Sequence, residues 1–202
     1  MVHVGGNIVR VISGENKGRK LKAVSGRMTR PTTDKVKETI FNMIGPFFEA
    51  GMALDLYGGS GGLGIEALSR GVHHTVFVDR AGGACQVIHE NLKLCGYEAR
   101  STVLQMDSSR ALEKLSNDQR SFDLVFLDPP YAKQHLRQDL DTLIMKNMLA
   151  QDATVVVEHE ETVPLPDVID DRLVRVKYRT YQGQTAVSIY NFHPDQGSEH
   201  VE

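Results

Sequence analysis

The middle of the chain consists of short apolar runs that alternate with stretches in which apolar residues recur at helical spacing. The runs are rich in strand-forming residues and too short for helices, as is typical of strands buried on both faces of a parallel sheet. Strands are predicted at 52–57, 74–78, 102–105, 124–127 and 154–157, and helices at 65–70, 84–94, 109–115 and 136–148. Because right-handed crossovers leave few other arrangements, this order predicts an α/β fold with a doubly wound parallel sheet.

The C-terminal part of the chain has a different pattern. Helical periodicity stops after Pro166, and two alternating segments at 173–181 and 186–192 predict a closing antiparallel hairpin. Period two places three cations on one face of its first strand, namely Arg175, Lys177 and Arg179. A solvated surface and an RNA-facing surface explain these cations equally well.

The N-terminal part predicts a small β-hairpin that precedes the sheet. Its strands are expected at 9–13 and 19–24, and a linker rich in turn-forming residues follows at 25–31. Thr32 or Thr33 then caps an amphipathic helix at 34–44. The predicted domains are a basic hairpin extension with its linker (1–30), the α/β domain (31–194) and a polar tail expected to be disordered (195–202).

Charge is distributed unevenly along the chain. Residues 1–37 carry nine basic and two acidic side chains, a net charge of +7, whereas the other 165 residues carry 14 basic and 24 acidic ones, a net charge of −10. A basic arm on an acidic body favours an anionic partner, nucleic acid, over a merely solvated surface. The candidate RNA-binding residues are Arg10, Lys17, Arg19, Lys20, Lys22 and Arg30.

Composition argues against several classes of protein. No apolar run is long enough to span a bilayer, and the N-terminus lacks the basic-then-apolar order of a signal peptide. A cytoplasmic protein without a membrane partner is therefore expected. Cys85 and Cys95 fall in one helical stretch and in no metal-ligand spacing, so we expect reduced packing thiols and no metal site.

A glycine-rich turn follows the first strand of the predicted sheet. It contains the spacing Gly59-x-Gly61-x-x-Gly64. Such spacing suits a nucleotide site, because glycines permit a tight turn, close backbone approach to a ligand and close packing of the following helix. Alone, the spacing is a weak signal.

Carboxylates at three consecutive strands narrow the choice of ligand. Asp55 lies inside the strand before the glycine turn, where it would repel a pyrophosphate and could receive an ammonium group. Asp79 ends the next strand, placed for ribose hydroxyls, and Asp107 follows the third, placed for an adenine amine. S-adenosylmethionine carries all of these groups and is the predicted cofactor. A turn cap is the alternative role for any one of the three.

A carboxylate, two prolines and an aromatic ring follow the most apolar strand, in the stretch FDLVFLDPPY at 122–131. Pro129 and Pro130 cannot donate ladder hydrogen bonds, so the chain leaves the sheet after Asp128 and carries Tyr131 with it. Open α/β sheets bind ligands at the carboxyl ends of their strands. The candidate catalytic residues are therefore Asp128, Pro129 and Tyr131, with a turn cap and a packed ring as the alternative interpretation.

These motifs together resemble those of a known family. The run LDLYGGSGGLGIEALSRG at 54–71, with the later DPPY, looks like the class I S-adenosylmethionine-dependent methyltransferases that modify exocyclic amino groups of nucleobases. With GRKL at 18–21 and RPTTDKVKETIFN at 30–42, the chain closely resembles the RsmD family, the bacterial 16S ribosomal RNA guanine-N2 methyltransferases. It departs from that family at Gly58 and Gly62, where alanine is usual, and at Asp79, where glutamate is common.

The resemblance implies a Rossmann-like methyltransferase sheet of about seven strands, mostly parallel with a reversed last strand. It also implies chemistry at Asp128 to Tyr131 and a cofactor site, for which we expect Thr32, Asp55, Gly59, Gly61, Asp79 and Asp107. The implied partner is 16S ribosomal RNA or a 30S assembly particle, with guanine 966 as the target. We expect the protein to act as a monomer.

The predicted chemistry agrees with the residues themselves. A guanine amine is a poor nucleophile, and acceptors at Asp128 and Pro129 would favour its tetrahedral geometry and developing positive charge. Tyr131 would stack on a base turned out of its helix or loop. The same groups would serve adenine-N6 or cytosine-N4 methylation of DNA or RNA. Alternatives of other classes are a nicotinamide-dependent oxidoreductase and a non-enzymatic RNA-binding assembly factor.

Overall fold

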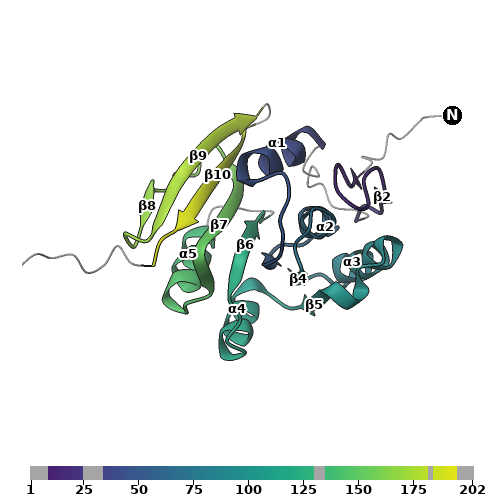
Figure 1. The fold of residues 1–202 in the computed structure, drawn as a ribbon. Coiled ribbons are helices and arrows are strands. Elements are labelled where there is room, and N and C mark those ends of the chain that lie inside the picture. The colour runs from purple at the N-terminus through teal and green to yellow at the C-terminus, as the bar shows by residue number, and fades with distance from the viewer. Residues whose placement is uncertain (1–8, 25–33, 130–134, 182–183, 195–202) are drawn as a thin grey trace, which may run out of the picture.

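The chain adopts an α/β fold in which helices cover both faces of one large sheet (Figure 1). The computed structural model describes residues 9–24, 34–129, 135–181 and 184–194. Arg30, Thr32 and Tyr131 lie outside these ranges, as do the predicted linker and the predicted polar tail. The expectations for these residues therefore stay predictions.

The described part of the chain forms a sheet of eight strands in the order β5-β4-β3-β6-β7-β10-β9-β8. The strands are β3 (Met52–Asp55), β4 (His74–Asp79), β5 (Ser101–Gln105), β6 (Phe122–Leu127), β7 (Leu149–Glu160), β8 (Val168–Ile169), β9 (Leu173–Tyr181) and β10 (Thr185–Phe192). The first five in the spatial order run parallel, and β10, β9 and β8 are each joined antiparallel. The predicted doubly wound sheet with its antiparallel end is confirmed, and the two-residue β8 is an additional edge strand.

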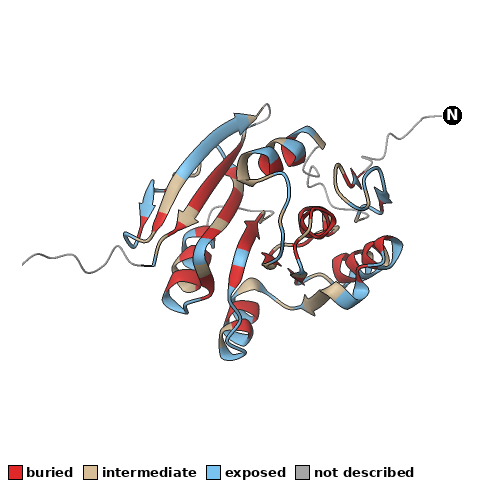
Figure 2. Ribbon diagram, viewed as in Figure 1, coloured by how far each residue is buried: buried red, intermediate tan, exposed pale blue. Residues whose placement is uncertain are grey.

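In the described ranges, one helix, α1, precedes the first strand of the sheet, and four further helices and a short 3₁₀ turn lie between strands. They are α1 (Asp34–Ile44), α2 (Gly62–Ser69), α3 (Gly82–Cys95), the turn Glu98–Arg100, α4 (Ser108–Asn117) and α5 (Leu136–Met145). Apolar side chains of α1, α2 and α3 pack on one face of the sheet, and those of α4 and α5 pack on the other. Figure 2 shows the central strands and the inward helix faces as buried. In the described part of the chain, no helix is long and apolar enough to cross a membrane.

The predicted N-terminal hairpin is present but shorter than expected. Its strands are β1 (Val9–Arg10) and β2 (Lys20–Leu21), which pair antiparallel. Val9, Val11 and Leu21 are buried in a cluster with side chains of α2 and α3. The hairpin therefore packs directly on the sheet's helical layer.

The start of α2 corrects the predicted extent of the glycine turn. The sequence predicts a turn that runs to Gly64, but α2 begins at Gly62, and the Ile65 amide closes its first turn on the Gly61 carbonyl at 2.8 Å. Glycine content alone misplaces this boundary. Gly59 and Gly61 have positive φ, whereas Gly62 and Gly64 have ordinary helical backbone that any residue can adopt.

A β-bulge in β9 corrects the prediction that three cations share one face. The register shifts so that Lys177 pairs with Ile189 and Arg175 with Tyr190, which leaves Val176 as the extra residue. Arg175 consequently lies on the face of Tyr190, where it hydrogen-bonds the Leu165 carbonyl. Lys177 lies on the opposite face and donates to the Met43 carbonyl of α1.

The close packing of α2 on β4 gives a stability prediction. A Cβ on Gly64 would lie 2.3 Å from the Phe77 ring, so Gly64→Ala should destabilise the protein by about 1 to 3 kcal/mol through overpacking. Gly62→Ala is a matched control, because its Cβ would meet its nearest neighbour, Val9, at an ordinary 3.5 Å. Urea unfolding of both variants tests this, and equal stabilities would show that α2 can move away from the sheet without cost.

Candidate active site

The glycine-rich turn lies where the strand order reverses. The chain proceeds from β3 to β4 and β5 on one side and then returns to β6 on the other, so β3 and β6 flank the topological switch point. Gly59 (φ 56°) and Gly61 (φ 80°) adopt the left-handed backbone that favours glycine. The Gly58 amide donates to the Val78 carbonyl of β4 at 2.8 Å, which holds the turn against the neighbouring strand.

Asp79, the last residue of β4, accepts hydrogen bonds from backbone amides of two segments, the glycine-rich turn and the turn that follows β4. It is 4% exposed, and its Oδ2 accepts a hydrogen bond from the Gly59 amide at 3.0 Å. Its Oδ1 accepts one from the Ala81 amide at 2.9 Å. Asp79 thus fixes the glycine turn as well as its own turn, and its contact with ribose stays a prediction.

Asp55, the last residue of β3, is a buried carboxylate at the same edge of the sheet. Its Oδ2 accepts a hydrogen bond from the Gly64 amide at 3.0 Å. Burial, assisted by the negative charge of Asp79, raises the pKa of Asp55 to about 7, although the hydrogen bond from Gly64 lowers it. A cationic ligand group beside Asp55 would stabilise its ionised form. The residue therefore fits the predicted ammonium contact.

The raised pKa of Asp55 predicts a pH-dependent effect of its neutralisation. Because the pKa in the folded protein exceeds the ordinary 3.8, the stability that Asp55 contributes is lost as pH rises from about 4 to about 7. The amide in Asp55→Asn stays neutral. The free energy of unfolding of the variant relative to wild type should therefore increase by roughly 1 to 3 kcal/mol between pH 5 and pH 7.5. Denaturant unfolding at both pH values tests this, and a difference independent of pH would contradict it.

Asp107 lies two residues beyond β5 and caps α4. Its side chain accepts a hydrogen bond from the Arg110 amide at 2.9 Å and lies 3.6 Å from the Arg110 guanidinium. Asp107 therefore has the capping role that the sequence analysis gave as its alternative role. The side chain is also 50% exposed, which leaves it accessible to a ligand, and the adenine contact stays a prediction.

Asp128 and Pro129 lie half-buried immediately beyond β6. Asp55 of β3 pairs with Phe126 of the neighbouring parallel strand β6. Asp128 follows Phe126 by two residues and therefore lies slightly beyond Asp55 in the strand direction. Strand neighbours in a sheet are about 4.8 Å apart. Four carboxylates thus follow one edge of the sheet, one for each neighbouring strand from β5 to β6, in the order Asp107, Asp79, Asp55 and Asp128.

A polar cluster that the sequence pattern did not indicate lies beside these carboxylates. The Tyr57 hydroxyl donates to the Asp139 carboxylate of α5 and lies 3.2 Å from the Ser108 hydroxyl of α4. Burial raises the pKa of Asp139, which is 2% exposed. One feature of the sequence could have indicated this cluster, namely a carboxylate at position 139 among the apolar residues Leu136 and Leu140, which lie on the buried face of α5.

The candidate RNA-binding residues of the hairpin fall into two groups. Lys17, Arg19 and Lys20 are exposed at the hairpin turn and second strand. Arg10 forms an ion pair with Asp34 at 2.6 Å, and Lys22 forms one with Glu90 at 2.8 Å. Neutralisation by these partners makes the first group the stronger candidates for phosphate contacts.

Two curated proteins are similar in sequence to this chain over most of its length. A curated relative from Bacillus subtilis, named "Putative rRNA methyltransferase YlbH", is 50% identical over 182 residues, which cover 90% of this chain and 98% of the relative. "Ribosomal RNA small subunit methyltransferase D" of Haemophilus influenzae is 34% identical, over 86% of this chain and 93% of that protein.

Solved structures and a family description agree with these relatives. The structure titled "Putative methyltransferase yhhF from Escherichia coli" has a TM-score of 0.79 and 28% identity, and the match covers 93% of this chain and 99% of that chain. The family described as Conserved hypothetical protein 95 matches residues 9–191. This match covers nearly the whole chain and confirms the resemblance found in the sequence. The chain therefore belongs to this family, the RsmD family.

Proposed function

We propose that the protein transfers a methyl group from S-adenosylmethionine to the exocyclic N2 amine of a guanine in 16S ribosomal RNA. The observation that carries the proposal is the order of carboxylates along the sheet edge. From β5 to β6 they follow the order of adenine amine, ribose hydroxyls and methionine ammonium along the cofactor, with Asp128 last, beside the methyl acceptor. Both curated relatives described above are named as rRNA methyltransferases, which supports RNA as the substrate class.

The residues at the switch point fit the cofactor chemically. The cofactor supplies an activated methyl group on a sulfonium centre. Asp55 would bind the ammonium group, Asp79 would accept hydrogen bonds from the ribose hydroxyls, and Asp107 would accept one from the adenine amine. The backbone at Gly59 and Gly61 carries no side chain, so the cofactor can approach it closely. A pyrophosphate fits this edge poorly, since Asp55 and Asp79 would repel it.

Asp128 and Pro129 act on the target amine. The Asp128 carboxylate and the Pro129 carbonyl would accept hydrogen bonds from both N–H groups of the amine. These bonds would direct the nitrogen lone pair at the methyl group and stabilise the positive charge that develops as the new N–C bond replaces the S–C bond of the cofactor. The products would be the methylated amine, S-adenosylhomocysteine and one proton. The resemblance gives Tyr131 a stacking role on the extruded base. By the same resemblance, the target nucleotide is guanine 966.

Methyl transfer to unmodified RNA tests the proposal. The protein is incubated with labelled S-adenosylmethionine and 30S particles or 16S ribosomal RNA that lack the modification, and the RNA is digested to nucleosides. The expected product is N2-methylguanosine. Methylated adenine or cytosine would contradict the guanine assignment, and RNA binding without transfer would favour an assembly factor. A melting temperature raised by NAD but not by S-adenosylhomocysteine would favour an oxidoreductase.

The exposed cations of the hairpin give a prediction for RNA affinity. Replacing Lys17, Arg19 and Lys20 by Gln should weaken RNA binding, because each cation that holds a phosphate also displaces counterions from the RNA. The dependence of binding on salt should flatten by about 0.7 to 0.9 unit of slope for each phosphate that the variant no longer holds. Binding measured at several salt concentrations tests this.

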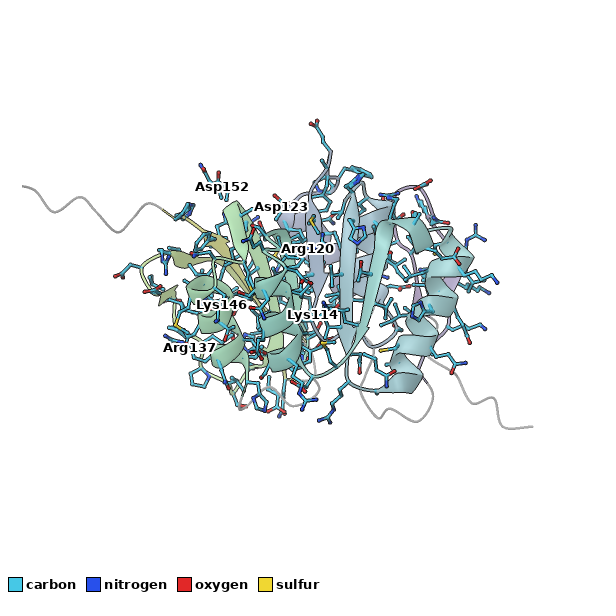
Figure 3. The ribbon with its side chains drawn as sticks, turned by 90° about the horizontal axis from the view of Figure 1, so that it is seen from below. Lys114, Arg120, Asp123, Arg137, Lys146 and Asp152 are labelled. Carbon is cyan, nitrogen blue, oxygen red and sulfur yellow. The ribbon has the colours of Figure 1, made fainter. Side chains whose placement is uncertain are left out.

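A control variant neutralises three exposed cations on the face formed by α4 and α5, where Figure 3 shows Lys114, Arg120 and Lys146. The charge change is the same, so the control separates net charge from position. If both variants flatten the slope equally, the hairpin has no specific phosphate contacts.

A further inference from the structure

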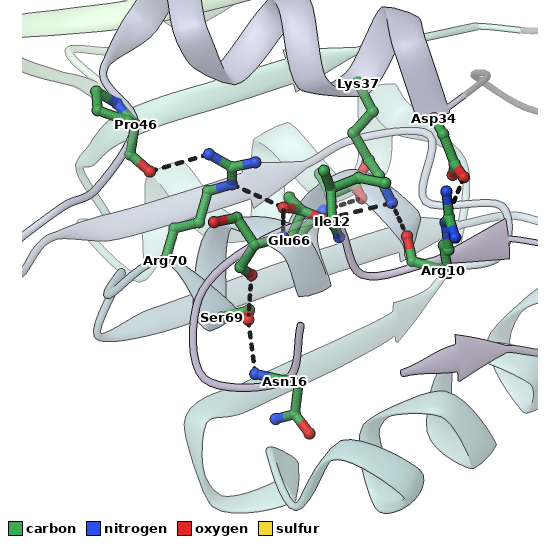
Figure 4. A network of polar contacts seen from close by, with 12 residues as sticks. Arg10, Ile12, Asn16, Asp34, Lys37, Pro46, Glu66, Ser69 and Arg70 are labelled. Carbon is green, nitrogen blue, oxygen red and sulfur yellow. Dashed lines mark hydrogen bonds and ion pairs between the residues drawn. The ribbon is translucent and has the colours of Figure 1, made fainter. Parts of the chain in front are cut away.

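The segment of the hairpin that follows β1 is held by a buried carboxylate of α2, as Figure 4 shows. Glu66 is fully buried and accepts hydrogen bonds from the Ile12 amide at 2.8 Å and the Ser13 amide at 2.9 Å. Arg70 and Lys37, also buried, pair with Glu66 at 2.7 Å and 3.4 Å. Two cations and two amides therefore stabilise one carboxylate that binds the hairpin backbone.

The hairpin turn fits α2 closely at a second point. The Ser69 hydroxyl donates to the Ser13 carbonyl at 2.7 Å, and the Glu15 amide donates to the Ser69 carbonyl at 2.8 Å. Gly14 has a φ of 84°, and a Cβ there would lie 1.8 Å from the Ser69 carbonyl oxygen. No side chain fits between the hairpin and the helix at this position, so the two backbones are in direct contact.

Asn91 of α3 connects Lys22, the residue that follows β2 of the hairpin, to the glycine-rich turn. Its side chain is fully buried, and its Oδ1 accepts a hydrogen bond from the Lys22 amide at 2.7 Å. Its Nδ2 donates to the Lys22 carbonyl at 3.0 Å and to the Ser60 carbonyl at 2.9 Å. Ser60 lies between Gly59 and Gly61. One amide group therefore bonds both the candidate RNA arm and the candidate cofactor turn.

We propose that Asn91 is a positioning residue that fixes the basic hairpin to the glycine-rich turn, so that cofactor binding at this turn and the position of the hairpin are linked. The inference rests on the proposed function, which assigns the turn to the cofactor and the hairpin to RNA. The hydrogen bonds of Asn91 would hold RNA phosphates bound by Lys17, Arg19 and Lys20 at a fixed distance from the methyl group of the cofactor. A small displacement of a bound substrate can lower the reaction rate by a large factor. The hydrogen bonds of Asn91 should therefore affect the rate of methyl transfer more than the affinity for RNA.

Amide hydrogen exchange of the wild-type protein tests the linkage without any RNA. Addition of S-adenosylhomocysteine should slow exchange at the Lys22 amide and at neighbouring hairpin amides several-fold, because a ligand that orders the turn also orders the group bonded to it. In Asn91→Ala the hairpin amides should no longer respond to the ligand. Hairpin exchange that is unaffected by the ligand in the wild-type protein would overturn the inference.

Single-turnover transfer at saturating cofactor and RNA tests the positioning role. Asn91→Ala should transfer roughly tenfold more slowly, while the salt dependence of RNA binding stays unchanged because the hairpin cations remain. Asn16→Ala is a matched control, since its side chain joins the hairpin to the Cys95 carbonyl of α3 at 3.1 Å without contacting the glycine turn. Its rate should stay within about twofold of wild type.

The outcomes separate this inference from the proposed function. A folded Asn91→Ala protein with the wild-type rate would overturn the positioning role, because a purely structural residue lowers stability but not turnover. Wild-type protein that transfers no methyl group, yet shows the ligand-dependent hairpin protection, would contradict the proposed function and leave the linkage supported. If Asn91→Ala does not fold, the wild-type exchange experiment alone decides the linkage.

Discussion

Asp128→Ala should lower the single-turnover rate of methyl transfer by roughly a hundredfold to a thousandfold, the usual cost of losing one preorganised electrostatic partner. The carboxylate lies just beyond β6 at the switch point. In the proposed mechanism it accepts a hydrogen bond from the attacking amine and stabilises the positive charge that forms on nitrogen. Asp128→Asn should also be strongly impaired, because the amide still accepts a hydrogen bond but carries no charge.

The Asp128 variants also separate catalysis from folding. Both should fold and bind S-adenosylmethionine within a few-fold of wild type, because the proposed cofactor ligands Asp55, Asp79 and Asp107 are unchanged. Asp118→Ala, at the exposed end of α4, is a control for the removal of an aspartate. If Asp128 only caps a turn, activity should fall in proportion to stability. Near-normal transfer by folded Asp128→Ala would refute the mechanism.

Asp79→Ala should weaken S-adenosylmethionine binding by about 1.5 to 3 kcal/mol, the range for hydrogen bonds to a charged group. The structure adds a second reason for this weaker binding. Asp79 also accepts a hydrogen bond from the Gly59 amide, so its removal frees the glycine turn of the candidate cofactor site. Titration calorimetry measures the affinity, and denaturant unfolding measures any accompanying decrease in stability.

A conservative variant distinguishes the two contributions of Asp79. Asp79→Glu keeps the carboxylate, and glutamate is common at this position in the family the sequence resembles. It should retain most of the affinity if the ribose contact dominates. Equal affinity of Asp79→Ala and the wild-type protein would show that the ribose assignment is wrong.

The sheet and the edge that carries the site could be predicted because local patterns determine them. Apolar runs indicated the strands. Asp79 and Asp128 follow two of those runs directly, and Asp107 lies two residues beyond a third. Parallel strands bring such residues to one edge whatever the details of packing. The order of the carboxylates across that edge then follows from right-handed crossovers.

The contacts that join distant elements could not be predicted, because each depends on tertiary packing. The Tyr57–Asp139 hydrogen bond links residues 82 positions apart, and the bond between Asn91 and Lys22 spans 69 positions. The bulge at Val176 leaves no signal in a period-two pattern. Charge counting found the basic hairpin, but it could not show which cations already have acidic partners.

The most direct test of the central claim is mass mapping of 16S ribosomal RNA from a strain that lacks this gene. The RNA should lack one N2-methylguanosine, at guanine 966 by the family resemblance. Wild-type protein supplied in trans should restore the modification, whereas Asp128→Ala, produced at the same level, should not. Ribosomal RNA with every N2-methylguanosine in place, in the absence of the gene, would contradict the assignment.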